Sequence, residues 1–176
     1  GKTTFLRCLL DQLKANKGVI KWSENAVLGY CPQDSTSVFN SELTLFDWMS
    51  QWRTPKHDDL TVRSMLGRLL FTADDYLKKV AVCSGGEKNR LLFGKLMMQD
   101  TNVLIMDEPT NHLDMEAIES LNKALKTYDG TLIFVSHDRE FVSSLATRVL
   151  EIKHQTLVDF HGTYGEYLAK QAADNS

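Results

Sequence analysis

An apolar segment of the chain ends in two adjacent carboxylates. Residues 103–106 are all apolar, which is typical of a short buried strand, and Asp107 and Glu108 follow directly. In open α/β sheets, ligands bind at the carboxyl ends of the strands. Asp107 could hold Mg²⁺ there through its water shell, and Glu108 could orient or deprotonate a water that attacks a phosphate. Alone, the pattern is more often an ordinary strand that runs into an acidic turn.

A phosphate-binding sequence opens the chain. Gly1-Lys2-Thr3-Thr4 matches the closing half of the G-x-x-x-x-G-K-[ST] loop. In that loop, N–H groups at a helix N-terminus and the lysine bind phosphates, and the hydroxyl coordinates Mg²⁺. The following helix is predicted by apolar residues at helical spacing, namely Phe5, Leu6, Leu9, Leu10 and Leu13. Because the first half of the loop is not in the sequence, we expect an N-terminally truncated fragment of a longer protein.

A third segment, Ser84-Gly85-Gly86-Glu87, precedes an apolar helical pattern over residues 91–97. Serine followed three residues later by glutamate is a capping box, which explains this pair without any ligand. A cap does not need two consecutive glycines, and they leave bare N–H groups and the positive end of the helix dipole open to an anion. We interpret the segment as a phosphate site and keep the plain cap as the alternative.

Two polar residues follow further strand patterns. Gln33 comes after the apolar run 26–31, where its amide could meet a metal or the attacking water. His137 follows the buried-strand pattern 131–135 and precedes Asp138, which suits a helix cap. Either residue alone is typical of a strand end or a turn. Their order with the other segments along the chain makes a functional role the stronger interpretation.

In this order the segments resemble the ATP-binding cassette (ABC) family across the whole chain. The Walker A, Q-loop, signature, Walker B, D-loop and switch elements correspond to Gly1-Lys2-Thr3-Thr4, Gln33, Ser84-Gly85-Gly86-Glu87, Asp107-Glu108, Asn111-His112-Leu113-Asp114 and His137. The D-loop and the sequence Ser136-His137-Asp138-Arg139 look like the ABC-F branch. Residues 21–25, 46–52 and 93–98 are similar to the second cassette of the bacterial YbiT type.

The resemblance implies an α/β fold of the P-loop NTPase class and ABC ATPase type. It has a mostly parallel core sheet, flanking helices and an inserted helical subdomain. ATP and Mg²⁺ would be the cofactors, with Thr3, Gln33 and Asp107 around the metal. Glu108, His137 and Gln33 would be catalytic. The residues implied in ATP binding are Gly1, Lys2, Thr3, Thr4, Ser84, Gly85, Gly86, Glu87 and Asp114.

The resemblance also implies partners. Two cassettes of one protein would stack head to tail around ATP, each signature capping the γ-phosphate held by the other. ABC-F proteins have no membrane domain, and we expect a cytoplasmic protein that acts at the ribosome and its tRNA, with effects on translation. As a fragment with half a phosphate loop, residues 1–176 are expected to be inactive alone.

Two rival classes stay open. The ATPase subunit of an ABC membrane transporter would carry the same catalytic set, although Asn111-His112 and Asp138-Arg139 argue against it. A non-catalytic, ATP-dependent scaffold is the second. The presence of both Glu108 and His137 argues against it, because degenerate cassettes usually lose one of them.

Composition is that of one ordinary globular domain. The 176 residues are 43% hydrophobic and 24% charged, and no apolar run approaches the ~20 residues that span a bilayer. The three cysteines lack metal-site spacing, so we interpret them as reduced thiols. A net charge of −3 argues against a nucleic-acid surface over the whole domain. Lys14, Lys17 and Lys21 fit a solvated face, with a local contact left open.

The expected layout alternates strands and helices, which predicts a parallel sheet covered on both faces. We expect one domain over 1–176, with a helical subdomain at 34–82 and a C-terminal helix and tail at 163–176. Strands are expected at 19–22, 26–31, 103–106, 131–135, 149–152 and 157–160. Helices are expected at 3–15, 45–77 with a break at Thr54-Pro55, 114–127, from 138, and at 164–170.

Overall fold

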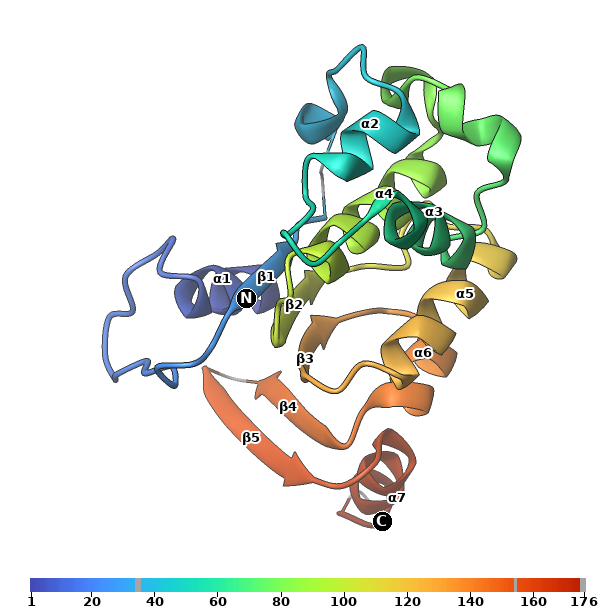
Figure 1. Ribbon diagram of the computed structural model, residues 1–176. Coiled ribbons are helices and arrows are strands. Elements are labelled where there is room, and N and C mark those ends of the chain that lie inside the picture. The colour runs from blue at the N-terminus through green and yellow to red at the C-terminus, as the bar shows by residue number, and fades with distance from the viewer. Residues whose placement is uncertain (34–35, 154, 175–176) are drawn as a thin grey trace. The chain divides into compact units, whose positions relative to one another are not determined.

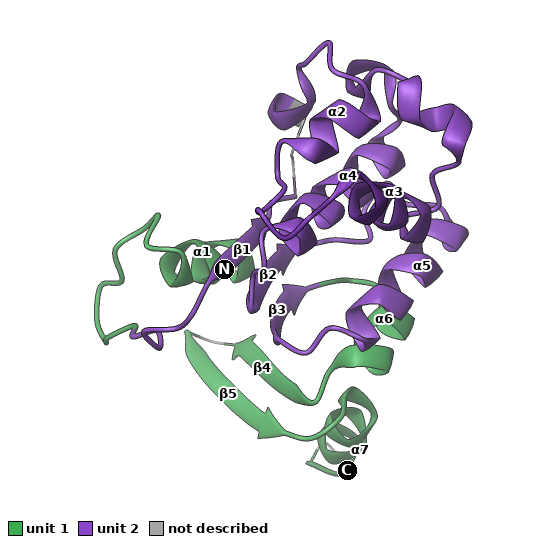
Figure 2. Ribbon diagram, in the orientation of Figure 1, with its two compact units in different colours: residues 1–20, 136–176 green, residues 21–135 purple. Residues whose placement is uncertain are grey.

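The computed structural model describes residues 1–33, 36–153 and 155–174, which fall into two compact units. The larger unit comprises residues 21–135, and the smaller one comprises residues 1–20 and 136–176 (Figures 1 and 2). The expected start of the helical subdomain at Asp34 and the last two residues of the expected tail lie outside the described residues.

The larger unit is built on a parallel sheet in the order β1-β2-β3. Its strands are β1 (Leu28–Cys31), β2 (Val103–Asp107) and β3 (Thr131–Val135). The central strand β2 is buried along its whole length, which explains why its sequence is a continuous apolar run. In register, Leu28 lies opposite Val103, and Val103 lies opposite Thr131. The three carboxyl ends therefore share one edge of the sheet, as the alternation predicted.

At the opposite, amino-terminal edge of the sheet, one residue connects the strands. The Oδ1 of Asn102 accepts from Val27 N at 2.7 Å, and its Nδ2 donates to Asn25 O at 2.8 Å. Its main-chain carbonyl accepts from Thr131 N at 2.9 Å. Asn102 thus connects the amino-terminal ends of all three strands and fixes their register.

Helix α4 (Gly85–Met98) lies against β1 and contacts α2 (Leu45–Ser50), α3 (Asp59–Arg68) and α5 (Met115–Lys126). Its interior glycine allows this close approach. A Cβ added at Gly94 would lie 2.5 Å from a methyl carbon of Leu69 and 2.7 Å from the Met49 methyl carbon. The helix that begins at the signature is therefore rigidly seated in the core of its unit.

The helical region buries many of its large apolar side chains. Leu45, Trp48 and Met49 are buried, and Phe39 stacks on Trp48 with ring centroids 4.9 Å apart. The predicted break at Thr54-Pro55 falls between α2 and α3. The end of the expected helical stretch differs, because α3 ends at Arg68 and two 3₁₀ helices follow, η2 (Ala73–Leu77) and η3 (Val80–Val82). Leu70 lies two residues beyond the end of α3. It is 40% exposed, because its φ of 65° turns the chain out of the helix.

The smaller unit contains α1 (Lys2–Leu9), α6 (Arg139–Leu145) and an antiparallel hairpin of β4 (Arg148–Lys153) and β5 (Thr156–His161). Helix α7 (Tyr164–Asp174) packs against α6 and β4. The two strands and the terminal helix confirm the sequence prediction. In the described part of the chain, no helix has the length and apolar character that a membrane span requires.

Two expected elements are wrong. Helix α1 ends at Leu9 rather than Ala15, and Asp11 with φ 57° breaks the helical geometry. Residues 19–22 form no strand, and within the described ranges no strand pairs with them. Val19 is 93% exposed, so its apolar character does not report burial. A short β pattern needs a partner strand to form, which local periodicity cannot supply.

Candidate functional site

The carboxyl edge of the parallel sheet carries the predicted acidic pair. Asp107 is the last residue of β2 and is 2% exposed, and Glu108 follows at 8% exposed. The Glu108 N–H donates to Val135 O at 2.8 Å, which anchors it to the end of β3. Gln33 lies two residues beyond β1 at the same edge, with an exposed side chain. The larger unit thus brings these three predicted residues to one end of its sheet.

Asp107 is suited to a cation. Its Oδ2 is buried and has no hydrogen-bond partner among the described residues. A buried carboxylate without a partner is costly, and a metal ion or its water shell would satisfy it. No group of three or more His, Cys, Asp or Glu in the described ranges could enclose a metal. A cation here would need phosphate or water as its other ligands, the usual arrangement for Mg²⁺ at nucleotides.

Cys31 is close enough to Asp107 for their charges to interact. Burial, followed by the smaller effect of the Asp107 charge, raises the pKa of the Cys31 thiol to about 12. The thiol therefore stays protonated at neutral pH, whereas metals and electrophiles require the thiolate. The three cysteines are all free thiols, as predicted. Cys31 is buried and contributes to packing rather than to catalysis or metal binding.

The turn after β2 holds two residues in the left-handed region. Glu108 has φ 52° and His112 has φ 63°. This backbone costs about 1–2 kcal/mol for a residue with a Cβ, so the surrounding structure must hold it in place. The hydrogen bond from Glu108 N to Val135 O is one such restraint. The conformation turns the chain at Glu108, directly after the end of β2.

The signature residues 84–87 begin α4 as predicted, and the capping box is present. Ser84 Oγ accepts from Glu87 N at 3.2 Å, and Glu87 Oε2 accepts from Ser84 N at 2.7 Å. The glycines serve a second purpose, since a Cβ on Gly86 would lie 3.3 Å from His112 O. Bare backbone at Gly86 therefore lets the start of α4 lie against the turn that follows Glu108.

A side-chain hydrogen bond joins the same two segments. Asn89 Nδ2 donates to Asn111 O at 2.9 Å, so α4 is tied to the D-loop one turn beyond the signature. Asp114 ends that loop and accepts from Ala117 N at 2.8 Å, capping α5. Sequence reasoning missed Asn89, because nothing in its local pattern points to a carbonyl 22 residues away. The signature and the D-loop therefore lie next to each other in the larger unit.

The remaining predicted residues belong to the smaller unit. Gly1 caps α1 by accepting from Phe5 N at 3.0 Å, and Lys2, Thr3 and Thr4 are exposed in its first turn. His137 is exposed just before the cap of α6. Their roles stay predictions.

The predicted cap of α6 is confirmed. The Oδ1 of Asp138 accepts from Phe141 N at 3.0 Å, and Asp138 N donates to Ser136 Oγ at 3.1 Å. This local network fixes the backbone on both sides of His137. The histidine is therefore held in a defined turn while its side chain reaches solvent.

Comparison with known proteins gives the same family as the sequence pattern. The family described as ABC transporter matches residues 1–111. "Probable ATP-binding protein YbiT" of Escherichia coli O157:H7 is 60% identical over 174 residues, covering 99% of this chain and 33% of that protein. "ABC transporter F family member 5" of Arabidopsis thaliana is 39% identical, covering 97% of this chain and 25% of that protein.

The fold has solved counterparts. A chain in the crystal structure of the complex of archaeal ribosomal stalk protein aP1 and archaeal ribosome recycling factor aABCE1 superposes with a TM-score of 0.78. It is 23% identical, with 99% of this chain and 34% of that chain covered, so the likeness concerns the fold. The chain spans a third or less of the length of the two curated relatives above. It belongs to the ATP-binding cassette family and, within that family, resembles the F branch.

Proposed function

We propose that the chain binds and hydrolyses MgATP as one cassette, the second of two, in an ABC-F protein. The observation that carries the proposal is the buried Asp107-Glu108 pair at the carboxyl end of β2, where Asp107 Oδ2 has no hydrogen-bond partner in the described part of the chain. Ligands of open α/β sheets bind at this edge. Membership of the ABC family indicates that the ligand at this pair would be ATP.

Each residue has a defined task in this proposal. By family resemblance, Lys2 and the N–H groups at the start of α1 would bind phosphates, and the hydroxyl of Thr3 would serve as a Mg²⁺ ligand. In the larger unit, Asp107 and Gln33 would hold Mg²⁺. When bound, Mg²⁺ supplies positive charge against the phosphate oxygens. Glu108 accepts a proton from the attacking water. The hydrogen bond from Glu108 N to Val135 O fixes the backbone that carries this carboxylate.

The signature would act on the nucleotide of the other cassette. Ser84, Gly85 and Gly86 begin α4 with bare N–H groups at the positive end of the helix dipole. His137 would sense the γ-phosphate in its own cassette. ATP bound between two cassettes would then favour their closed state, and hydrolysis would release it, as in any ligand-driven population shift.

Asp107→Asn tests the metal assignment. We expect Mg²⁺ activation of ATP hydrolysis by the full protein to weaken about 10- to 100-fold. The free energy of unfolding without nucleotide should stay the same or rise, because a buried unpaired charge is removed. Magnesium titration of turnover and chemical denaturation measure the two effects, with the exposed Asp129→Asn as the matched control. Marked destabilisation with unchanged magnesium dependence would assign Asp107 a structural role.

The output of the switch is proposed from the F-branch resemblance. We infer that the closed two-cassette protein binds the ribosome near the exit-tRNA site and acts in translation, in the cytoplasm and without a membrane domain. Cosedimentation of the full protein with ribosomes should increase with ATP and fall with ADP. Copurification with a membrane protein, and no nucleotide-dependent ribosome binding, would favour the transporter subunit instead.

A further inference from the structure

The signature carries a charge opposed to its proposed ligand. Glu87 is in the first turn of α4, where a carboxylate favours the helix dipole but repels an approaching anion. It cannot turn away, because its Oε2 accepts from Ser84 N at 2.7 Å as part of the capping box. If residues 84–86 meet a phosphate, as proposed above, the Glu87 charge must be compensated from within the fold.

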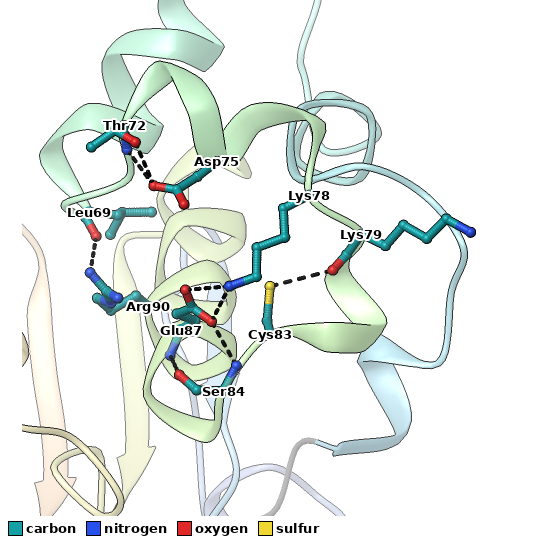
Figure 3. Close-up of polar contacts among 9 residues, drawn as sticks. All are labelled: Leu69, Thr72, Asp75, Lys78, Lys79, Cys83, Ser84, Glu87 and Arg90. Atoms are coloured by element: carbon teal, nitrogen blue, oxygen red, sulfur yellow. Dashed lines mark hydrogen bonds and ion pairs between the residues drawn. The ribbon is translucent and has the colours of Figure 1, made fainter.

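Lys78 provides that compensation. Its Nζ lies 2.8 Å from Glu87 Oε1 and 2.9 Å from Oε2, as Figure 3 shows. The lysine side chain is 31% exposed and the glutamate side chain 18%, so water screens the pair only in part. The backbone is fixed as well, since Lys78 O accepts from Leu45 N at 2.9 Å. The lysine therefore reaches the signature from an anchored position.

The neighbouring carboxylate does not draw Lys78 away. The Asp75 side chain is hydrogen-bonded to Thr72, whose N and Oγ1 each donate to Oδ2 at 2.8 Å (Figure 3). The hydrogen bond to Glu87 raises the pKa of Lys78. Burial alone would raise the pKa of Glu87, but the contacts of Lys78 and Ser84 outweigh it and lower that pKa. Lysine and glutamate are thus both ionised at neutral pH.

We propose that Lys78 is a positioning residue for phosphate contact by the signature. It neutralises Glu87 and holds that carboxylate on the Ser84 N–H, so that the start of α4 attracts the nucleotide of the partner cassette. The inference rests on the proposed function of the signature. It adds a residue outside the signature itself, six positions before Ser84.

The test uses Lys78→Met in the full two-cassette protein. Single-turnover hydrolysis at the partner site and ATP-driven closure should each weaken about tenfold, as for the loss of a partly buried charge partner. Lys78→Arg should restore both to within about threefold, because it keeps the charge and can bind a carboxylate with two N–H groups. The matched control is Lys79→Met at the adjacent position. The amine of Lys79 pairs with the exposed Glu42, so this variant should hydrolyse ATP at the normal rate.

A second background separates charge from structure. If Lys78 acts by neutralising Glu87, Lys78→Met should change turnover less than about twofold when Glu87→Gln is already present. The deficit of the single variant should also shrink in 0.5 M salt, which screens the Glu87 charge left without its lysine. An equal loss in both backgrounds, or no loss with Lys78→Met, overturns the inference. Near-normal turnover of Gly86→Asp would instead overturn the proposed phosphate contact, so the two failures are distinguishable.

Discussion

Glu108→Gln in the full two-cassette protein is expected to lower ATP hydrolysis by about 10²–10⁴-fold. The amide keeps the shape of the side chain but cannot accept the proton of the attacking water. ATP binding should survive, because the phosphate contacts are made elsewhere, and the closed state should accumulate with ATP. Single-turnover hydrolysis and size-exclusion or scattering measurements of closure would follow both effects.

The control for this substitution is Glu119→Gln on the exposed side of α5, which changes the same groups away from the sheet edge. Turnover of Glu108→Gln within a few-fold of the unmodified protein would remove Glu108 from the catalytic role. If turnover falls but the closed state does not accumulate, Glu108 is correctly assigned as the general base, and the proposed ATP-driven closure of the two cassettes is wrong.

Gly86→Asp is expected to abolish ATP-driven closure and to lower hydrolysis at the partner site by at least about 10²-fold, comparable to losing a transition-state contact. The new carboxylate would face the γ-phosphate, whereas the helix cap itself would tolerate it, since an acid favours a helix N-terminus. Thermal unfolding should therefore change little. If the segment is only a cap, turnover stays near normal.

Two variants separate the causes of the Gly86 effect. Gly86→Ala adds the same Cβ, 3.3 Å from His112 O, without the charge, and so measures the steric part. Gly67→Asp adds the charge on α3, where an added Cβ meets no atom within 4 Å. Ser84→Ala should cost about 1 kcal/mol of stability as a lost cap. A Gly86→Ala loss as large as that of Gly86→Asp would assign the effect to packing against the D-loop.

Local sequence was enough for the features whose causes are local. The β2 run ending in Asp107 and Glu108, and the caps at Ser84 and Asp138, depend on residue types within a few positions of one another. Strand burial and capping hydrogen bonds arise at that range, so periodicity and spacing predict them. The parallel sheet followed from alternation of strands and helices, because parallel neighbours need a crossover between them.

Other features of the site depend on contacts between residues far apart in the sequence, which local patterns do not predict. Nothing near Lys78 predicts a partner at Glu87, and Asn89 meets Asn111 only because α4 packs beside the turn after β2. The left-handed backbone of Glu108 and the unpartnered Oδ2 of Asp107 also depend on the surrounding sheet edge. The strand predicted at residues 19–22 does not form, and no strand in the described ranges pairs with this segment. Contacts between residues far apart in sequence fix these features, since pairing and burial are properties of the assembled core.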